Sequence, residues 1–337
     1  MCNLNLFQSF FMKKYLILVF ITFFSCNELK KTSLSGLIFG TSYNIQFYSS
    51  GNSNYYNEIV DIFKEIDMSM STYKKTSIIS RVNNNNSVQL DDHFKNVFGF
   101  SKKMYKITGG RFDPSIGLLV NYWGFGPEKF VPDSKINPND QFTYLLSKTG
   151  FNRFEIIDNK LSRPMDSYID FNAIAKGYAV DEVAEFLKNK QIDNFLVEIG
   201  GEINSSGINI DKNKPWLVAI DMPRFDGDRS NYSSLELNNI SLASSGTYRK
   251  FKIDSMGNRY AHIINPLTGY PTKTNILSVT VKASSCIEAD AYATAIHSMN
   301  IEEIKEFFSL NNNISSLVIF ENDKNELEEL ILNNFYN

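Results

Sequence analysis

The chain has 337 residues, of which 43% are hydrophobic and 21% are charged, and its formal net charge is −3. This length gives an ample core in one large unit or in two lobes. Lysines and acidic residues are interspersed along the sequence, so no basic patch favours nucleic acid as a partner. Of the three cysteines, only Cys286 lies beyond the first 26 residues, which excludes a disulfide framework. We interpret Cys286 as a small buried residue rather than a nucleophile.

The N-terminal segment 12–26 has the pattern of a lipoprotein signal peptide. Two lysines precede an apolar run that ends at Cys26, and polar residues follow. The run is too short to span a bilayer comfortably, since that takes about 20 apolar residues. We therefore expect Cys26 to be acylated, which would anchor the chain to a bacterial membrane, facing the periplasm or the exterior. Residues 1–11 are a possible mis-start upstream of an initiator at Met12.

The first third of the chain predicts one strand and two helices. Alternating apolar residues predict a half-buried strand at 36–48, and apolar residues spaced by three and four predict helices at 55–68 and 93–106. Between these helices, a run of four asparagines from Asn83 indicates a surface loop. A short helix or turn is expected at 118–123.

The rest of the chain mixes helices with strands. Helices are expected at 175–189, 287–298 and 301–310, and strands at 195–199, 216–220, 234–237, 241–243, 276–282 and 316–320. No repeat or low-complexity linker marks an internal boundary. The pattern predicts a mixed α+β protein.

Asp290 and Thr294 lie four residues apart in one of the expected helices, so their side chains share a face. A carboxylate and a hydroxyl placed in this way can bind one hard cation beside a phosphate. The alternative is an exposed acid next to a threonine that bonds to its own helix backbone.

Two more segments combine chemically useful residues with loop signals. Residues 170–177 place an acid, a lysine and a glycine where a loop enters a helix, and a cation such as Lys176 is unfavourable at a helix start unless an anion lies nearby. His262 stands beside a Pro/Gly turn. It is a candidate base because the imidazole group in general titrates near neutrality. We interpret His93 and His297 as structural.

Nine segments, taken in order, resemble the FAD:protein FMN transferase family, or ApbE-like lipoproteins, once assigned to thiamine biosynthesis. They begin at Gly40-Thr41, Met70, Gly110, Trp123, Asp170, Glu198, Ser245, His262 and Ala289. The resemblance covers nearly all of the chain from Phe39 onward, and the ordered set is specific. It implies an ApbE-like, T-fold-related α+β architecture with two closely packed lobes, and a flavin transferase domain at 27–337.

The resemblance also implies the reaction. The pyrophosphate of FAD is cleaved, FMN is transferred through its phosphate to a Ser or Thr hydroxyl of a target protein, and AMP is released. Mg²⁺ is implied as a cofactor, held by a backbone oxygen of Ala173 with the side chains of Asp290 and Thr294. The partner is an exported acceptor protein with a short Asp/Gly/Ser/Thr-rich flavinylation motif.

The same resemblance assigns further residues. It places Lys176 near the diphosphate and makes His262 the group that takes the acceptor's proton, so that His262, Lys176 and Asp290 are the expected catalytic residues. The expected contacts to the flavin or its adenosine are Phe39, Tyr73, Arg111, Phe112, Asp113, Asp170, Lys176 and Ile264. Asn265 departs from the family, in which an aspartate more often follows His-Ile-Ile.

Two other functions remain open from the sequence. An FAD pyrophosphatase would use the same metal site with water in place of the protein hydroxyl, releasing free FMN and AMP. A non-catalytic FAD-binding lipoprotein would bind FAD without turnover, which the presence of both Asp290 and Thr294 disfavours.

Overall fold

The computed structural model describes residues 29–51, 54–226, 228, 230–248, 251–253, 259–272 and 275–336. The predicted signal peptide at 12–26, with Cys26, lies outside these residues. Among the described residues, no helix combines the length and apolar character needed to cross a membrane.

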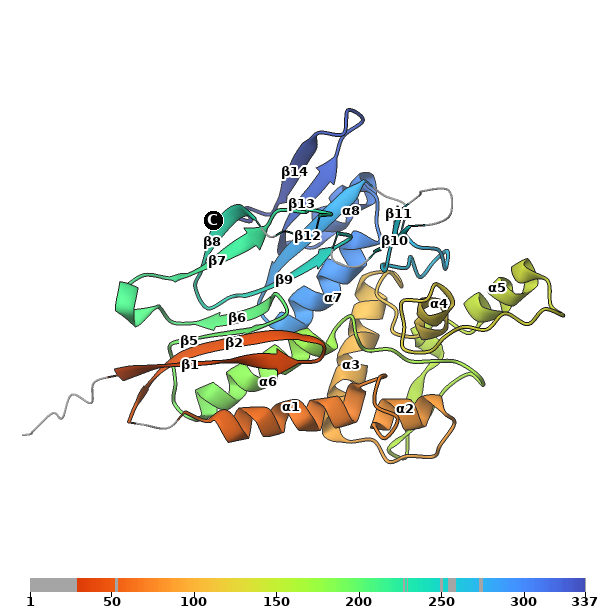
Figure 1. Cartoon of the computed structure of the whole chain (residues 1–337), viewed down its shortest axis with the longest axis horizontal. Coiled ribbons are helices and arrows are strands. Elements are labelled where there is room, and N and C mark those ends of the chain that lie inside the picture. Colours follow the sequence, from red (N-terminus) through yellow and green to blue (C-terminus); the bar gives the residue numbers. More distant parts are fainter. Residues whose placement is uncertain are drawn as a thin grey trace, which may run out of the picture.

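An eight-stranded antiparallel sheet runs through the molecule in the order β1-β2-β5-β6-β9-β12-β13-β14. Its strands are β1 (Leu29–Ile38), β2 (Thr41–Ser50), β5 (Phe195–Ile199), β6 (Glu202–Ser206), β9 (Ser241–Gly246), β12 (Ile276–Ala283), β13 (Ser315–Glu321) and β14 (Leu327–Leu332). Only two register pairs join β6 to β9 in the middle of the sheet. On either side of this junction the strands take different directions, with β1 and β2 running across the view and β12 to β14 rising steeply (Figure 1). The predicted α+β class is confirmed.

Most of the helices lie on one face of the sheet. The helices are α1 (Tyr56–Met70), α2 (Ile78–Asn83), α3 (Asp92–Ile107), α4 (Gly117–Tyr122), α5 (Pro138–Ser147), α6 (Ala175–Asn189), α7 (Cys286–His297) and α8 (Ile301–Leu310). Of these, α4 and α5 pack in a separate cluster to the side of the sheet (Figure 1). Helices α6 and α7 contact the strands directly, and α1 packs against α6 (Figure 1). Every residue of α7 except Thr294 is buried, as expected for a helix enclosed on all sides, and its alanines allow close approach.

The other face of the sheet carries a smaller core. The hairpin of β7 (Trp216–Asp221) and β8 (Asn231–Leu237) packs there, around Trp216. Because successive strand residues point to opposite faces, Phe47 joins the large core under the helices while Tyr48 joins the smaller one. Two short hairpins, β3 (Glu155–Ile157) with β4 (Lys160–Ser162) and β10 (Phe251–Ile253) with β11 (Arg259–Ala261), lie outside the main sheet.

The prediction of a single strand at 36–48 is wrong. The chain reverses at Phe39 and Gly40, which have φ values of 51° and 74°, and β1 pairs with β2 across this two-residue turn. A two-residue turn keeps the alternation in phase, so the apolar pattern continues through it and hides it. Most other predicted elements are confirmed within a few residues. The strand predicted at 241–243 continues through Ser244 and Ser245 to Gly246.

Candidate active site

Two tight turns, one at Phe39–Gly40 and one at Gly200–Gly201, lie side by side at one end of the sheet. Gly200 and Gly201 join β5 to β6 with φ values of 63° and 100°, and the Gly200 N–H donates to the Ser42 carbonyl over 3.0 Å. A Cβ on Gly200 would lie 2.8 Å from the Thr41 methyl, which explains the glycine there. We call this end of the sheet the turn end. Strand β9 runs towards it and α6 starts from it.

Helices α6 and α7 are joined by polar contacts rather than by apolar packing alone. Asp181 of α6 caps the start of α7, accepting the Cys286 N–H over 2.9 Å and the Ile287 N–H over 2.8 Å. One turn earlier on α6, the Gly177 N–H donates to Asp290 Oδ2 over 3.0 Å. A Cβ on Gly177 would lie 2.5 Å from the Cys286 carbonyl oxygen and 2.8 Å from the Asp290 Cβ, so only glycine permits this approach.

The two helices run antiparallel, and their contacts are spaced four residues apart on each helix. Asp181 faces the start of α7, and Gly177 faces Asp290. The next step along α7 reaches Thr294, because residues four apart share a helix face, whereas Ala173 lies in the turn just before α6. That Ala173, Asp290 and Thr294 together bind a metal stays a prediction.

Lys176 is paired with an acid that sequence reasoning did not single out. Its ammonium lies 2.7 Å from Glu202 Oε1, and the side chain of Glu202 is 1% exposed. Glu202 belongs to a segment that the sequence analysis noted, but its partner stands 26 positions earlier in the chain, and no local pattern joins the two. The pair brings a cation and a buried anion to the turn end.

Charges of both signs surround the Cys286 thiol. Burial raises its pKa well above the usual value, and the nearby negative charges of Asp181, Asp290 and Glu202 act in the same direction, while Lys176 opposes them. The prediction of a small buried cysteine is confirmed, since Cys286 is fully buried. The charges of Lys176, Glu202 and Asp290 thus all act on this one thiol.

The donor set fits a hard cation. In the described part of the chain, no three side chains drawn from His, Cys, Asp and Glu are grouped to hold a metal. What α7 offers is one buried carboxylate, Asp290, which accepts the Gly177 N–H of α6, and one hydroxyl, Thr294, a turn further along α7. A site with few protein oxygens suits Mg²⁺, which usually keeps several ligands for water and substrate phosphates.

The residues predicted to contact the flavin differ in their burial and in their neighbours. Phe39 lies at the β1–β2 turn and is half-buried, with its ring 5.9 Å from that of Phe63. Tyr73 is 62% exposed. Asp170 is buried and accepts the Asn172 N–H over 2.8 Å. The pKa of the Tyr73 phenol is raised, first by partial burial and second by the negative charge of Asp170.

Arg111, Phe112 and Asp113 make contacts that hold the fold. Arg111 donates to the Ser298 carbonyl over 2.7 Å and pairs with Glu303, while Phe112 is buried in the main core. Asp113 accepts from the N–H groups of Ser115 and Gly150. Burial raises the pKa of Asp113, and these hydrogen bonds oppose the shift. A role of the three in binding flavin stays a prediction.

His262 and Ile264 lie at the other side of the site, on a loop near α4. Ile264 is 4% exposed and packs with Leu119 and Phe125, and the half-buried His262 ring lies 6.3 Å from that of Phe125. Asn265 accepts the Leu267 N–H over 2.9 Å and donates to the Ser298 carbonyl over 3.5 Å. Both ends of the Asn265 amide thus bond to the backbone and help to hold this loop in place.

His297 is buried at the end of α7, in keeping with its predicted structural role. Its ring nitrogens face the Ser245 hydroxyl at 3.1 Å and the Ile276 carbonyl at 3.4 Å. Burial, with the charge of His262 as a second cause, lowers the pKa of His297 to about 3. A neutral imidazole therefore lies close to His262.

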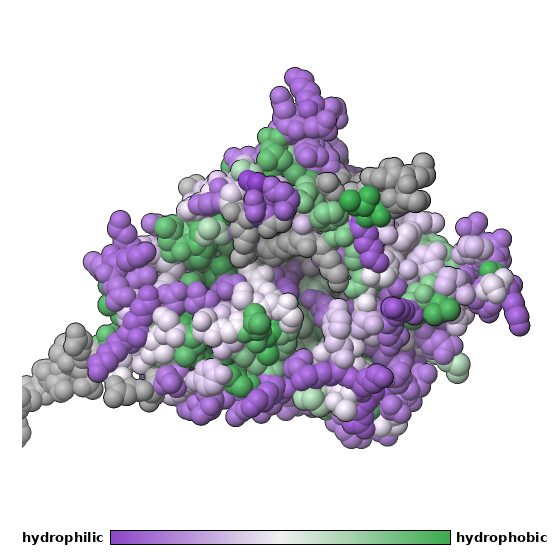
Figure 2. All heavy atoms as spheres, viewed as in Figure 1, coloured by the Kyte–Doolittle hydropathy of each residue, from purple (hydrophilic) through white to green (hydrophobic). Residues whose placement is uncertain are grey.

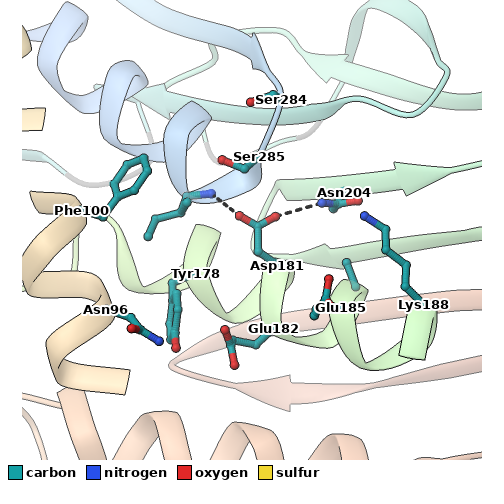
Figure 3. A pocket seen from close by; sticks show the side chains of 12 residues that line it. Asn96, Phe100, Tyr178, Asp181, Glu182, Glu185, Lys188, Asn204, Ser284 and Ser285 are labelled. Carbon is teal, nitrogen blue, oxygen red and sulfur yellow. Dashed lines mark hydrogen bonds between the residues drawn. The ribbon is translucent and has the colours of Figure 1, made fainter. Parts of the chain in front are cut away.

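A separate cavity of about 400 Å³ opens at the start of α7. Its lining includes Phe100, Tyr178 and Glu182, and Asp181 reaches from its wall to the backbone of α7 and to Asn204 (Figure 3). None of the predicted site residues lines it.

The face of the molecule in Figure 2 is hollowed near its centre, with strongly polar side chains gathered mostly towards its edges.

Comparisons with known proteins match most of the chain. A family model described as the ApbE family matches residues 39–318. The FAD:protein FMN transferase of Haemophilus influenzae is 37% identical over 306 residues, covering 87% of each chain, and that of Vibrio cholerae is 36% identical, covering 81% of this chain and 83% of the relative.

Solved structures match over almost the whole fold. The flavin transferase ApbE from Vibrio cholerae superposes with a TM-score of 0.79 at 34% identity, covering 91% of this chain and 98% of its own. The apo form of the Pseudomonas stutzeri flavinyl transferase ApbE gives a TM-score of 0.79 at 26% identity, covering 90% and 95%. The fold and these relatives define a flavin transferase of the α+β class. The chain belongs to the ApbE family.

Proposed function

We propose that this chain is an FAD:protein FMN transferase. It binds FAD, joins the FMN phosphate to a Ser or Thr hydroxyl of an acceptor protein and releases AMP. The observation that carries the proposal is the α6–α7 contact, where Gly177 and Asp290 meet and Lys176 stands beside them. The names of the relatives support the same reaction.

Mg²⁺ is the cofactor that we propose for this contact, held by the Ala173 carbonyl, the Asp290 carboxylate and the Thr294 hydroxyl. When bound, it would offset the negative charge of the diphosphate. Asp290 is held in place for this role by the Gly177 N–H. The start of α6 carries the positive end of the helix dipole, which favours a phosphate there.

The rest of the chemistry belongs to side chains of this chain. Lys176 faces the phosphate that leaves with AMP, where negative charge develops as its bond to the FMN phosphorus breaks. His262 takes the proton of the acceptor hydroxyl as the oxygen–phosphorus bond forms. The neutral, buried His297 nearby adds no competing positive charge. Phe39, Tyr73 and Ile264 border the space for the flavin.

The cellular setting is a further part of the proposal. The pattern at residues 12–26 supports acylation of Cys26, which would hold the enzyme at a membrane facing the periplasm or the exterior. The acceptor is then an exported protein. Globomycin, which blocks lipoprotein signal cleavage, should cause a larger precursor to accumulate; a Cys26→Ala variant that is processed and fractionates like the wild type would contradict the anchor.

The test incubates the domain that starts after Cys26 with FAD, Mg²⁺ and a candidate acceptor domain. Flavin fluorescence on a denaturing gel reports the transfer, and AMP release reports cleavage. Asp290→Asn keeps an oxygen for the Gly177 N–H but removes the charge, so we expect transfer to fall by about 10²- to 10³-fold with FAD still bound. Chelation of Mg²⁺ should have the same effect on the wild type.

The outcomes separate the candidate functions. A fluorescent acceptor band that requires Mg²⁺ supports the transferase. AMP with free FMN and no labelled band, across several acceptors, would instead indicate a pyrophosphatase. FAD that stays bound and intact would contradict both enzymes and leave a binding protein.

A further inference from the structure

Glu202 is a buried carboxylate with one oxygen unused. Its Oε1 lies 2.7 Å from the Lys176 ammonium, while Oε2 is enclosed and meets no hydrogen-bond donor among the described residues. A buried carboxylate is costly unless it is paired. The ammonium of Lys176 is therefore the partner that offsets the burial of the Glu202 carboxylate.

The pair joins two parts of the fold that meet at the turn end of the sheet. Glu202 directly follows the Gly200–Gly201 turn and begins β6, whereas Lys176 lies in the first turn of α6. The carboxylate is rigidly placed, because a two-residue turn and the sheet hold it. A lysine side chain is long and flexible, and a fixed acid removes much of that freedom. The position of the ammonium is thus set by the sheet.

We propose, on the basis of the proposed function, that Glu202 is a positioning residue that holds the Lys176 ammonium where charge develops on the leaving AMP phosphate. An ammonium has three N–H donors, so one can be directed at Glu202 while another meets a phosphate oxygen. The carboxylate repels the FAD diphosphate, so it brings no gain in FAD affinity. Its benefit is confined to the transition state, which needs the cation already in place.

A mutant cycle tests this arrangement. The variants are Glu202→Gln, Lys176→Met and the double variant, with Glu198→Gln as the matched control. Glu198 lies on the same hairpin and accepts the Gly201 N–H over 2.8 Å, a bond that glutamine can keep. For each protein, FAD affinity is measured by quenching of flavin fluorescence without acceptor, and kcat is measured by AMP release with Mg²⁺ and acceptor.

We expect Glu202→Gln to lower kcat by about tenfold or more, with the Kd for FAD changed by less than about threefold. In the Lys176→Met background, the same substitution should have no further effect on kcat, because Glu202 acts through that lysine. Glu198→Gln should behave like the wild type. Equal losses in kcat and in FAD affinity, or additive effects on kcat, would overturn the proposal.

Thermal unfolding provides a readout that does not depend on activity. Lys176→Met leaves the Glu202 carboxylate buried without its partner, so its Tm should be lower than that of the double variant, in which the charge is gone. A double variant that is no more stable than Lys176→Met would show that the pair is not buried as described.

Failure of the proposed function remains distinguishable. If the wild type releases AMP and free FMN without labelling any acceptor, the transferase reading fails, yet the cycle on AMP release still tests Glu202, because the leaving phosphate is the same. If the wild type binds FAD and never cleaves it, the positioning role is contradicted along with the transferase.

Discussion

The two sides of the candidate site are held by different forces. On the α6–α7 side, the contacts are directional: Asp181 caps α7, Gly177 donates to Asp290, and Lys176 is paired with Glu202. On the side of His262, apolar and aromatic packing predominates, with Ile264 and Phe125 in a cluster of their own. Hydrogen bonds fix distance and angle, whereas apolar contacts tolerate small shifts.

This difference matches the chemistry that each side is proposed to perform. Phosphate and metal ligands must be placed within a fraction of an ångström, because a misplacement of about 1 Å can lower a rate by about 100-fold. A flavin ring and an approaching protein segment need space and some adaptability. We therefore expect substitutions on the α6–α7 side to have larger effects than those on the His262 side.

Among substitutions that change packing rather than a proposed metal ligand, Gly177→Ala should have the largest effect. The new methyl group would meet the Cys286 carbonyl oxygen and the Asp290 Cβ, both on α7, so the two helices must move apart. We expect the free energy of unfolding to fall by about 2 kcal/mol. The transfer rate should fall by about 100-fold, since the metal ligands would no longer be aligned. Chemical denaturation and the fluorescent gel assay measure the two quantities.

Gly99→Ala is the matched control for this substitution. Gly99 is exposed within α3, and a Cβ there would meet nothing within 4 Å. Because alanine favours helix, this variant should be more stable by about 0.5–1 kcal/mol and fully active. If both alanine variants behave alike, the α6–α7 contact is not as tight as its geometry indicates.

Much of the α6–α7 side could be predicted from the sequence, since its residues follow helical spacing. Asp290 and Thr294 are four apart, and Lys176 and Gly177 open a helix that is found where expected, at Ala175–Asn189. The partners of these residues could not be predicted. Glu202 pairs with Lys176 across a strand and a turn, and such contacts depend on how the sheet brings distant segments together.

Other features were missed for different reasons. The turn at Phe39 has a positive φ at a residue type that rarely adopts it, and Gly40 beside it is the one turn signal within an unbroken alternation. Helix α5 follows a capping Asn137 and a proline at its start, signals that in retrospect identify it. The capping role of Asp181 appears only when α6 and α7 are seen together (Figure 3).

A smaller effect is expected at His297, which lies between the two sides of the site. There the free energy of unfolding should depend on pH. In the unfolded chain this histidine takes up a proton near pH 6.5, but in the fold its pKa is lowered to about 3, chiefly by burial. Protons therefore favour the unfolded state between these values. The stability that neutral His297 allows is complete above pH 6.5 and is lost as the pH falls, by about 2 kcal/mol at pH 5.

His297→Gln removes this titration and keeps groups that can bond to Ser245 and Ile276. Unfolding free energies of both proteins, measured from pH 7.5 to 5, should converge as the pH falls, because only the wild type loses the His297 contribution. The raised pKa values of Asp113 and Asp181 increase the free energy of unfolding as the pH falls, but they do so equally in both proteins. Parallel curves would contradict a neutral, buried His297.

The smallest effect is expected from Asn265→Asp, which introduces the residue more often found in the family. The aspartate keeps an oxygen for the Leu267 N–H and loses only the long contact to the Ser298 carbonyl. Arg111 donates to that same carbonyl over 2.7 Å, so a cation lies near enough to accommodate the new charge. We expect unfolding free energy to change by less than about 1 kcal/mol.

The informative quantity for this variant is the pH dependence of transfer. If His262 takes the acceptor's proton, a nearby carboxylate favours its protonated form, so the acidic limb of the rate profile should move to higher pH. Above that limb the rate should stay within about threefold of the wild type, because packing on this side tolerates small shifts. A loss of more than tenfold at every pH would mean that the His262 side is held as tightly as the α6–α7 side. An unchanged limb would mean that His262 is not the base.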